Sequence, residues 1–359
     1  MTNHSEPRQG PLLGLRVLEF ASIGPGPHCA MLLSDLGAEV LRIEREGGNG
    51  WPNPVADRGR KVITLDIRSD AGRERCLELA EGADVLIEGF RPGVMERLGL
   101  GPQDMQARNP RLVYGRMTGW GQTGPLAQSA GHDINYLALT GALAAIGARE
   151  GPAIPPLNLV GDFGGGSLYL AFGIMAALYE RERSGKGQVI DAAIVDGVSS
   201  MMSFFAGLLP SGAISLQRER NLLSGAAPHY RCYTCADGRD IAIGPLEPQF
   251  YREFLQRLDV PNLPENCADP EYWEAQSQQF AELFASRSRD EWCAVLEGSD
   301  ACFTPVLELE EAAQHPHLQA RGVYRTVEGV LHVAPAPRFS RTPGASRSSV
   351  QQDANAGWG

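Results

Sequence analysis

The sequence is short of lysine. Among its 359 residues Lys61 and Lys186 are the two lysines, and every other basic side chain that carries a permanent charge is arginine. An internal Schiff base of a pyridoxal enzyme needs a lysine, and these two stand in a basic run and in a loop. Arginine suits bidentate recognition of phosphate, although a GC-rich genome would give the same excess. The composition argues against a pyridoxal enzyme and allows a phosphate-bearing ligand.

A disulfide framework and a long hydrophobic run are also missing. The seven cysteines are odd in number and scattered, which favours a reducing, cytoplasmic environment. Cys232 and Cys235 have the spacing of zinc ligands but no second pair, so we expect no metal. The polar start is not a signal peptide. The longest apolar run, residues 168–179, is too short to span a bilayer and predicts a buried helix.

The charge is −11 and gives no basic face for nucleic acid. Strand-like and helix-like patterns alternate up to residue 194, which predicts an α/β fold with a large Rossmann-like, doubly wound parallel sheet. Around residue 220 the pattern changes to a hairpin followed by helices, typical of a smaller α+β domain. We therefore expect three segments: 1–224 as the first part of the large domain, 225–310 as the small domain, and 311–359 returning to the large one.

Two polar residues stand before helical patterns. His132 precedes one apolar pattern, and Asp162 precedes Gly164–Gly166 and a second one. A histidine and a carboxylate at converging helix starts can move protons near neutral pH. Asp162 could instead be a simple helix cap, but three glycines in a row favour a ligand lying against bare backbone. By spacing alone His132 could equally be a surface histidine.

Arginines gather at or just beyond the ends of the first strands. In a doubly wound sheet ligands bind at the carboxyl ends of the strands, which points to an anionic ligand there. The loop Gly24-Pro25-Gly26-Pro27-His28-Cys29 does not match a dinucleotide fingerprint, because Cys29 replaces the third glycine and the prolines lack amide donors. We interpret it as a rigid connection between strand and helix.

Several longer motifs resemble the family III CoA-transferases. They are LRVLE at 15–19, DLGAEVLRIE at 35–44, RPG at 91–93, GKGQ at 185–188, and TPV at 304–306 with HPH at 315–317. Within that family, GWGQTGP at 119–125, GHDINY at 131–136 and residues 158–167 are similar to the α-methylacyl-CoA racemase branch. The similarity covers nearly the whole chain.

The resemblance implies an interlocked homodimer with its active site between subunits. It implies that His132 and Asp162 are the acid/base pair and that Glu247, which spacing alone makes a first-turn helix acid, hydrogen-bonds the histidine from the partner subunit. It also implies a CoA site lined by Arg42, Leu65, Asp66, Ile67, Arg68, Gly89, Phe90, Arg91, Arg97, Gly131, Asp133, Ile134, Asn135 and Tyr136. No cofactor is expected, because CoA is part of the substrate.

The implied function is inversion of the α-carbon of 2-methylacyl-CoA thioesters by two bases, one on each face of an enolate. Backbone N–H groups near Asp162 or Tyr136 would stabilise the enolate oxygen. One alternative is a CoA-transferase in which Asp162 is the nucleophile, a mechanism that does not require His132. A second is a CoA-binding protein without catalysis. We expect an acyl-CoA partner and neither nucleic acid nor membrane.

Overall fold

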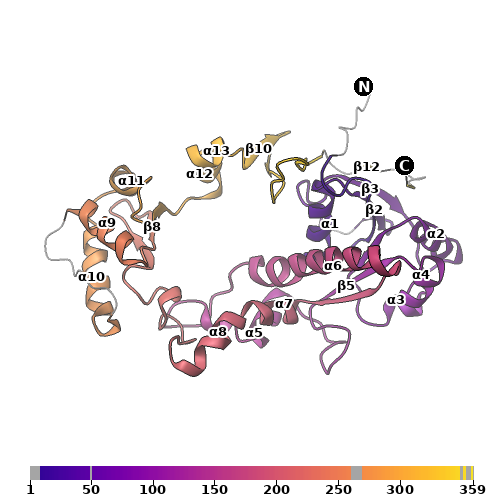
Figure 1. Cartoon of the computed structure of the whole chain (residues 1–359), viewed down its shortest axis with the longest axis horizontal. Coiled ribbons are helices and arrows are strands. Elements are labelled where there is room, and N and C mark those ends of the chain that lie inside the picture. Colours follow the sequence, from indigo (N-terminus) through magenta and orange to yellow (C-terminus); the bar gives the residue numbers. More distant parts are fainter. Residues whose placement is uncertain (1–8, 49–50, 260–268, 348–350, 353–356, 359) are drawn as a thin grey trace. The chain divides into compact units, whose positions relative to one another are not determined.

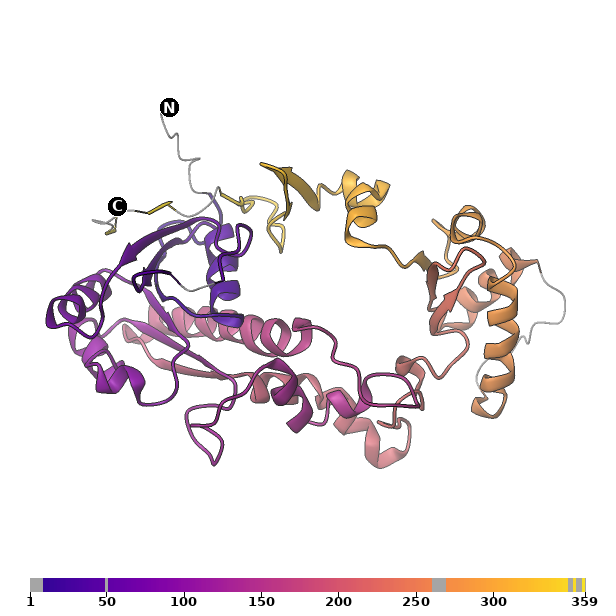
Figure 2. The same cartoon turned by 180° about the vertical axis from the view of Figure 1, so that it is seen from behind.

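A computed structural model describes residues 9–48, 51–259, 269–347, 351–352 and 357–358. The chain divides into two compact units, which are described separately (Figures 1 and 2). Unit 1 comprises Met1–Thr140, Pro156–Met202 and His317–Gly359, and unit 2 comprises Gly141–Pro155 and Ser203–Pro316. Residues 141–155 and 203–224, which the sequence analysis grouped with the large domain, thus belong to the second unit.

Unit 1 is built on a parallel sheet, so the prediction of an α/β fold is confirmed. Its strands are β1 (Arg16–Phe20), β2 (Glu39–Glu44), β3 (Arg60–Thr64), β4 (Val85–Glu88), β5 (Val113–Thr118) and β6 (Val189–Ala193). They lie in the order β3-β2-β1-β4-β5-β6, and the two-residue β12 (Gln351–Gln352) pairs with β3 (Figure 1). The strand order reverses between β1 and β4, where this class of sheet binds ligands.

Helices follow the strands much as their sequence patterns predict. They are α1 (Pro25–Asp35), α2 (Asp70–Glu81), α3 (Val94–Arg97), α4 (Pro102–Arg108), α5 (Asp133–Leu139), α6 (Tyr169–Ser184), α7 (Ile194–Met201) and, at the boundary of the units, α13 (Pro316–Ala320). The short hairpin of β10 (Tyr324–Val327) and β11 (Val330–Val333) follows. Helix α1 starts at Pro25, within the segment that was interpreted as a rigid connection, because proline fits the first helical position.

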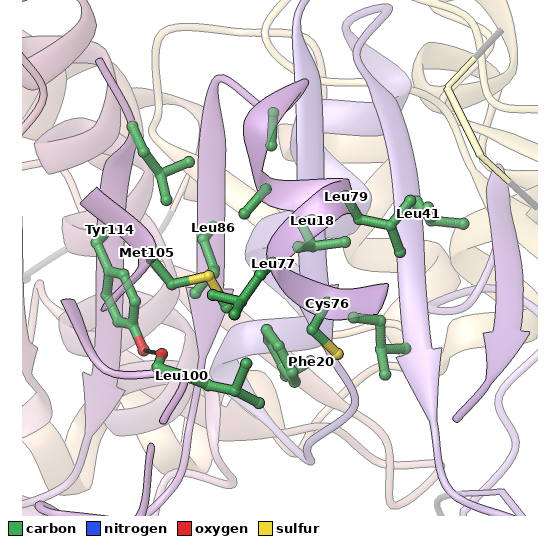
Figure 3. Packing of buried hydrophobic residues seen from close by; sticks show 14 of the residues in the cluster. Leu18, Phe20, Leu41, Cys76, Leu77, Leu79, Leu86, Leu100, Met105 and Tyr114 are labelled. Atoms are coloured by element: carbon green, nitrogen blue, oxygen red, sulfur yellow. Dashed lines mark hydrogen bonds between the residues drawn. The ribbon is translucent and has the colours of Figure 1, made fainter. Parts of the chain in front are cut away.

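The main apolar core lies between the sheet and helices α2 and α4. Leu18, Leu86 and Tyr114 from the strands meet Leu79 of α2 and Met105 of α4, all fully or almost fully buried (Figure 3). The Tyr114 hydroxyl donates to the Leu100 carbonyl oxygen at 3.1 Å, so this buried phenol keeps a polar partner. Side chains alternate along β1, and its next residues therefore face the opposite side of the sheet.

Helices α1 and α6 pack on that opposite side, where several charged side chains are buried. Glu19 of β1 pairs with Arg60 of β3, and Arg58 pairs with Asp35 at the end of α1. These side chains are at most 2% exposed. Removing one partner of such a pair leaves an uncompensated buried charge, which is strongly destabilising. The pairs therefore hold α1 against the strands.

A π-helix precedes α6 and contains Asp162 and Gly164–Gly166, which the sequence pattern placed before the helix. Leu159–Leu168 (η2) is π-helical and continues directly into α6. Together they form a 26-residue helix, Leu159–Ser184, which by length and composition alone could cross a membrane. The expected buried helix is in fact buried on one side only, since Phe172 and Tyr179 are 73% and 70% exposed.

Unit 2 contains the predicted hairpin. Strands β7 (Arg231–Thr234), β8 (Asp240–Ile243) and β9 (Phe303–Pro305) form an antiparallel sheet in that order. The helices of this unit are α8 (Ser203–Leu208), α9 (Pro248–Leu258), α10 (Trp273–Phe284), α11 (Arg289–Leu296) and α12 (Leu309–Gln314). Its core is aromatic, with Phe254, Phe280, Phe284 and Trp292 buried together.

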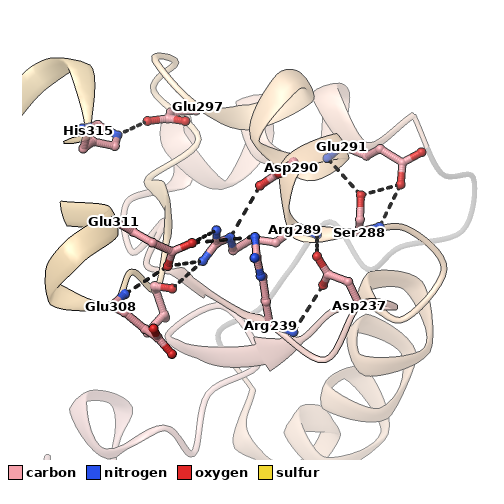
Figure 4. A network of polar contacts seen from close by, with 11 residues as sticks. Asp237, Arg239, Ser288, Arg289, Asp290, Glu291, Glu297, Glu308, Glu311 and His315 are labelled. Carbon is pink, nitrogen blue, oxygen red and sulfur yellow. Dashed lines mark hydrogen bonds and ion pairs between the residues drawn. The ribbon is translucent and has the colours of Figure 1, made fainter. Parts of the chain in front are cut away.

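A polar network ties together the elements of unit 2 (Figure 4). Arg289 at the start of α11 donates to both carboxylate oxygens of Glu311 on α12, at 3.0 and 2.6 Å. Its backbone N–H donates to Asp237 in the turn between β7 and β8. A bidentate pair has a fixed geometry, so this arginine fixes the two helices relative to the hairpin.

Candidate active site

The candidate site lies where the strand order reverses. The loop after β1 brings Gly24 against the π-helix: a β-carbon at Gly24 would lie 3.0 Å from Oδ2 of Asp162. The next loop along the sheet, after β4, begins with Gly89, where a β-carbon would be 3.3 Å from Ser22. Asp162 therefore stands at the carboxyl edge of the sheet, beside β1 and β4.

His132 is held in place by its own backbone. It is the N-cap residue of α5, and its N–H donates to Oδ1 of Asn135 at 3.0 Å, while its carbonyl oxygen accepts from the Asn135 N–H at 2.8 Å. This reciprocal pairing fixes the start of the helix. The His132 side chain is exposed, so a ligand can reach the imidazole.

Asp133 joins the two candidate bases. Its Oδ1 accepts a hydrogen bond from the backbone N–H of Asp162 at 2.6 Å, and it also accepts from the N–H of Gly161. The residue next to His132 thus binds the chain at Asp162. Asp133 was predicted only as a CoA-site residue; its contact with Asp162 joins residues 29 positions apart and has no sequence signal.

The environment of Asp162 favours its protonated form. Burial raises the pKa of this carboxyl, and the nearby Asp133 carboxylate raises it further. A hydrogen bond from Asn158 to Oδ2, at 3.4 Å, and the charge of His132 act in the opposite direction. A raised pKa makes the carboxylate a stronger base and so favours a role in proton transfer.

The glycines after Asp162 serve helix packing, which corrects the interpretation of bare backbone facing a ligand. They lie inside the π-helix, and Gly165 and Gly166 are buried. A β-carbon at Gly165 would come within 2.6 Å of Val198, and one at Gly197 within 1.9 Å of the Gly165 carbonyl oxygen. Glycine is therefore required because η2 and α7 approach each other closely.

The two backbone amides that were expected to stabilise the enolate oxygen already have hydrogen-bond acceptors within the protein. The N–H of Asp162 binds Asp133, and the N–H of Tyr136 binds the His132 carbonyl oxygen at 3.3 Å. Asp162 is likewise no N-cap, since that position is taken by Asn158. The π-helix moves the N-cap back to Asn158, whereas the two amides are engaged by the Asp133 side chain and by the first turn of α5.

Aromatic rings support the start of α5. Tyr136 is buried, its hydroxyl donates to the Gly131 carbonyl oxygen, and its ring meets Trp120 edge to face with centroids 4.7 Å apart. A β-carbon at Gly131 would collide with both rings. The exposed Arg91 lies close enough to oppose the effect of burial, which raises the pKa of Tyr136. Gly131, Tyr136 and Arg91 thus lie near one another.

Most of the other predicted CoA residues follow strands of the sheet at the same edge. Leu65, Asp66, Ile67 and Arg68 come directly after β3, Gly89 and Phe90 after β4, and Ile134 and Asn135 lie in the first turn of α5. Arg68 and Arg97 are exposed, with Arg97 at the end of α3. These positions suit cations that meet phosphates at a partly open surface.

Arg42 has a different environment. It is 3% exposed, and its guanidinium pairs with Asp57 and Glu44, both at 2.6 Å. Burial acts to lower the pKa of this guanidinium, but the surrounding carboxylates raise it. Arg42 therefore holds the segment around Asp57 against β2.

Glu247 belongs to unit 2. It is exposed and is the N-cap residue of α9, immediately before Pro248. Among the residues that the structure describes, no group of three or more histidine, cysteine, aspartate or glutamate side chains is placed to hold a metal ion.

The parallel sheet defines an α/β protein, with His132 and Asp162 as candidate bases near its carboxyl edge. Residues 12–350 match the model of the CoA-transferase family III, and the chain belongs to this family. The resemblance seen in the sequence is thereby confirmed.

Two relatives carry a more specific name. The alpha-methylacyl-CoA racemase of Mus musculus is 44% identical over 349 residues, which cover 96% of this chain and 90% of the relative. That of Homo sapiens is 42% identical over 335 residues, covering 92% and 87%. A CAIB/BAIF family protein from Brucella suis has a similar structure, with a TM-score of 0.82, 28% identity, and coverage of 95% of this chain and 96% of that one. The relatives support an isomerase.

Proposed function

We propose that this enzyme inverts the α-carbon of 2-methylacyl-CoA thioesters by moving one proton between two bases. The observation that carries the proposal is the Asp133 bridge, which holds the backbone of Asp162 beside His132. The names of the two racemase relatives support the same reaction. The acyl chain beyond the 2-methyl group is left open.

The reaction needs a base on each face of the substrate. His132 or Asp162 removes the α-proton, and the electron pair of the C–H bond moves into the enolate of the thioester. The other residue, in its protonated form, then gives a proton to the opposite face. The raised pKa of Asp162 supports its use in both directions.

The enolate oxygen requires hydrogen-bond donors. The first amides of an α-helix have no acceptor within the helix, and in α5 these belong to Asp133 and Ile134. They adjoin His132 and suit a developing negative charge at a helix start. We assign them this role in place of the engaged amides of Asp162 and Tyr136.

CoA binds along the carboxyl edge of the sheet in this proposal. Arg91, Arg97 and Arg68 meet its phosphates, and residues 131–136 lie near the thioester. The protein itself supplies the bases and the amide donors, so the proposal includes no metal and no organic cofactor.

The active enzyme is proposed to be a cytoplasmic homodimer. Helix α6 exposes the apolar side chains of Phe172 and Tyr179, and this exposed face supports the proposal that a second copy of the chain packs against it. Glu247 of the partner subunit would then accept a hydrogen bond from the His132 imidazole and fix its tautomer. We propose neither a membrane nor a nucleic acid as partner.

Incubation of one enantiomer of a 2-methylacyl-CoA in D₂O tests the function. The proposal predicts deuterium at the α-carbon together with loss of optical purity, without added cofactor. Acyl transfer to an acceptor acid without α-exchange would instead favour a CoA-transferase with Asp162 as the nucleophile.

A further inference from the structure

The first turn of α1 lies directly against the π-helix that carries Asp162. Gly24 faces the Asp162 carboxylate, as described above, and a β-carbon at Gly166 would lie 3.0 Å from Cβ of Pro25. One turn further along α1, His28 reaches the same helix. Gly24, Pro25 and His28 therefore all meet the helix that holds the carboxylate.

His28 makes two contacts with this helix. Its ring stacks on Phe163, the residue after Asp162, with centroids 4.4 Å apart and the planes 25° from parallel. Its Nδ1 forms a 2.7 Å hydrogen bond with Oγ of Ser167, whose side chain is fully buried. One imidazole thus joins the middle of the π-helix to its last turn.

The environment of His28 favours the neutral imidazole, which suits its contacts with Phe163 and Ser167. Burial lowers its pKa, and the nearby Arg58 and Arg60 lower it further, while Asp35 acts in the opposite direction. A neutral imidazole can stack and share a hydrogen bond with a buried hydroxyl at little electrostatic cost.

A long π-helix is rare and is often found at functional sites, so contacts that hold it in this form affect the side chains it carries. We propose that His28 is a positioning residue for Asp162: by binding Phe163 and Ser167, it keeps the Asp162 carboxylate directed at one face of the substrate. The inference rests on the proposed two-base reaction and extends it to a residue that does not touch the substrate.

A positioning role makes an unusual prediction about stereochemistry. If Asp162 serves one face and His132 the other, a displaced Asp162 slows exchange of the enantiomer whose proton it removes. Exchange of the other enantiomer depends on His132, which can remove a proton and return a deuteron on its own face. Loss of His28 should therefore affect the two enantiomers unequally.

The experiment measures α-deuterium exchange of each enantiomer of a 2-methylacyl-CoA in D₂O for full-length variants. Asp162→Ala first identifies the enantiomer that depends on Asp162. His28→Ala should slow exchange of that enantiomer by about ten- to a hundredfold, the effect of a displacement on the order of 1 Å. Exchange of the other enantiomer and KM for both should stay as in the wild type.

Further variants separate the two contacts. Ser167→Ala removes the hydrogen bond but keeps the stacking, and should give a smaller loss for the same enantiomer. His28→Asn keeps a polar group near the position of Nδ1 and should restore part of the rate. His317→Ala, at an exposed histidine of α13, is the matched control and should behave as the wild type.

Equal loss for both enantiomers in His28→Ala and Ser167→Ala, or no loss in either, would overturn the positioning role. Equal loss would mean that the contacts serve folding or CoA binding in general. A wild-type enzyme without α-exchange would contradict the proposed function itself, and the assignment of His28 with it.

Discussion

Asp133 accepts the backbone N–H of Asp162 at 2.6 Å, and this bond connects the starts of two helices. Its charge also helps to raise the pKa of Asp162. One carboxylate therefore both places the second base and adjusts its proton affinity.

Replacement of Asp133 separates these two effects. Asp133→Ala removes the acceptor, and we expect kcat to fall by about ten- to a hundredfold because Asp162 loses its anchor. Asp133→Asn keeps an acceptor oxygen and should retain most of kcat. Steady-state racemisation by both variants is the measurement. A rise in KM with unchanged kcat would show that Asp133 serves CoA binding alone.

The pH dependence follows from the raised pKa of Asp162. Proton removal by this residue needs the carboxylate, so exchange of the enantiomer that it serves should decline on acidification with an apparent pKa above the ordinary value of aspartate. The pH profile of kcat/KM for each enantiomer in D₂O checks this. A decline only within the ordinary aspartate range would contradict it.

The same shift has a consequence for stability. The folded state binds the Asp162 proton more tightly than the unfolded chain does. The stability this carboxyl contributes is complete below the unfolded pKa and is lost as pH rises through the folded pKa. Asp162→Asn should therefore raise the melting temperature at neutral pH, with a gain that shrinks on acidification. A lower melting temperature for Asp162→Asn at neutral pH would be the opposite result.

The arginines should divide into two groups. Arg97→Ala should raise KM for the thioester by about tenfold, with little change in kcat. This is the effect expected from the loss of one hydrogen bond to a charged group. This effect should weaken at high salt. Arg42→Ala should instead lower the free energy of unfolding by about 3–5 kcal/mol, because it leaves Asp57 and Glu44 unpaired.

Urea unfolding and steady-state kinetics on both variants test this division. Arg111→Ala is a control for exposed pairs, since Arg111 and Glu182 are half or more exposed and 3.5 Å apart; the expected loss is less than about 1 kcal/mol. A stable Arg42→Ala with a raised KM would return Arg42 to the CoA site as a direct contact.

The dimer can be tested at its proposed surface. Light scattering at micromolar concentration should give twice the mass of the 38.7 kDa chain. Phe172→Glu puts a charge on the exposed face of α6 and should shift the mass toward the monomer, with loss of activity if Glu247 acts across subunits. Glu180→Gln, a polar replacement on the same helix, is the control. A monomeric wild type would contradict the proposal.

The sheet could be predicted from sequence because its signals are local. Alternating apolar residues, Ser69 in front of α2 and Pro102 as the first residue of α4 suffice to place the elements near β3 and β5. The His132 and Asp162 pair was also visible, as polar residues before helical patterns.

Other features could not be predicted, because distant residues decide them. The glycines at 164–166 suggested bare backbone facing a ligand, yet they lie inside a π-helix, where Val198 and Gly197 of α7 pack closely against Gly165. Arg42 was predicted to bind CoA, but in the structure its guanidinium pairs with Asp57. His28, in a loop that we interpreted only as a rigid connection, contacts Ser167, 139 residues further along the chain.

The central claim is that His132 and Asp162 serve opposite faces of one enolate. The most direct test is α-deuterium exchange of each single enantiomer by His132→Ala and Asp162→Ala. Racemisation should fall in both variants by on the order of 10²–10⁴, while each keeps some exchange, with retention, for a different enantiomer. Normal racemisation by His132→Ala would contradict the account and leave Asp162 as the nucleophile of a transferase.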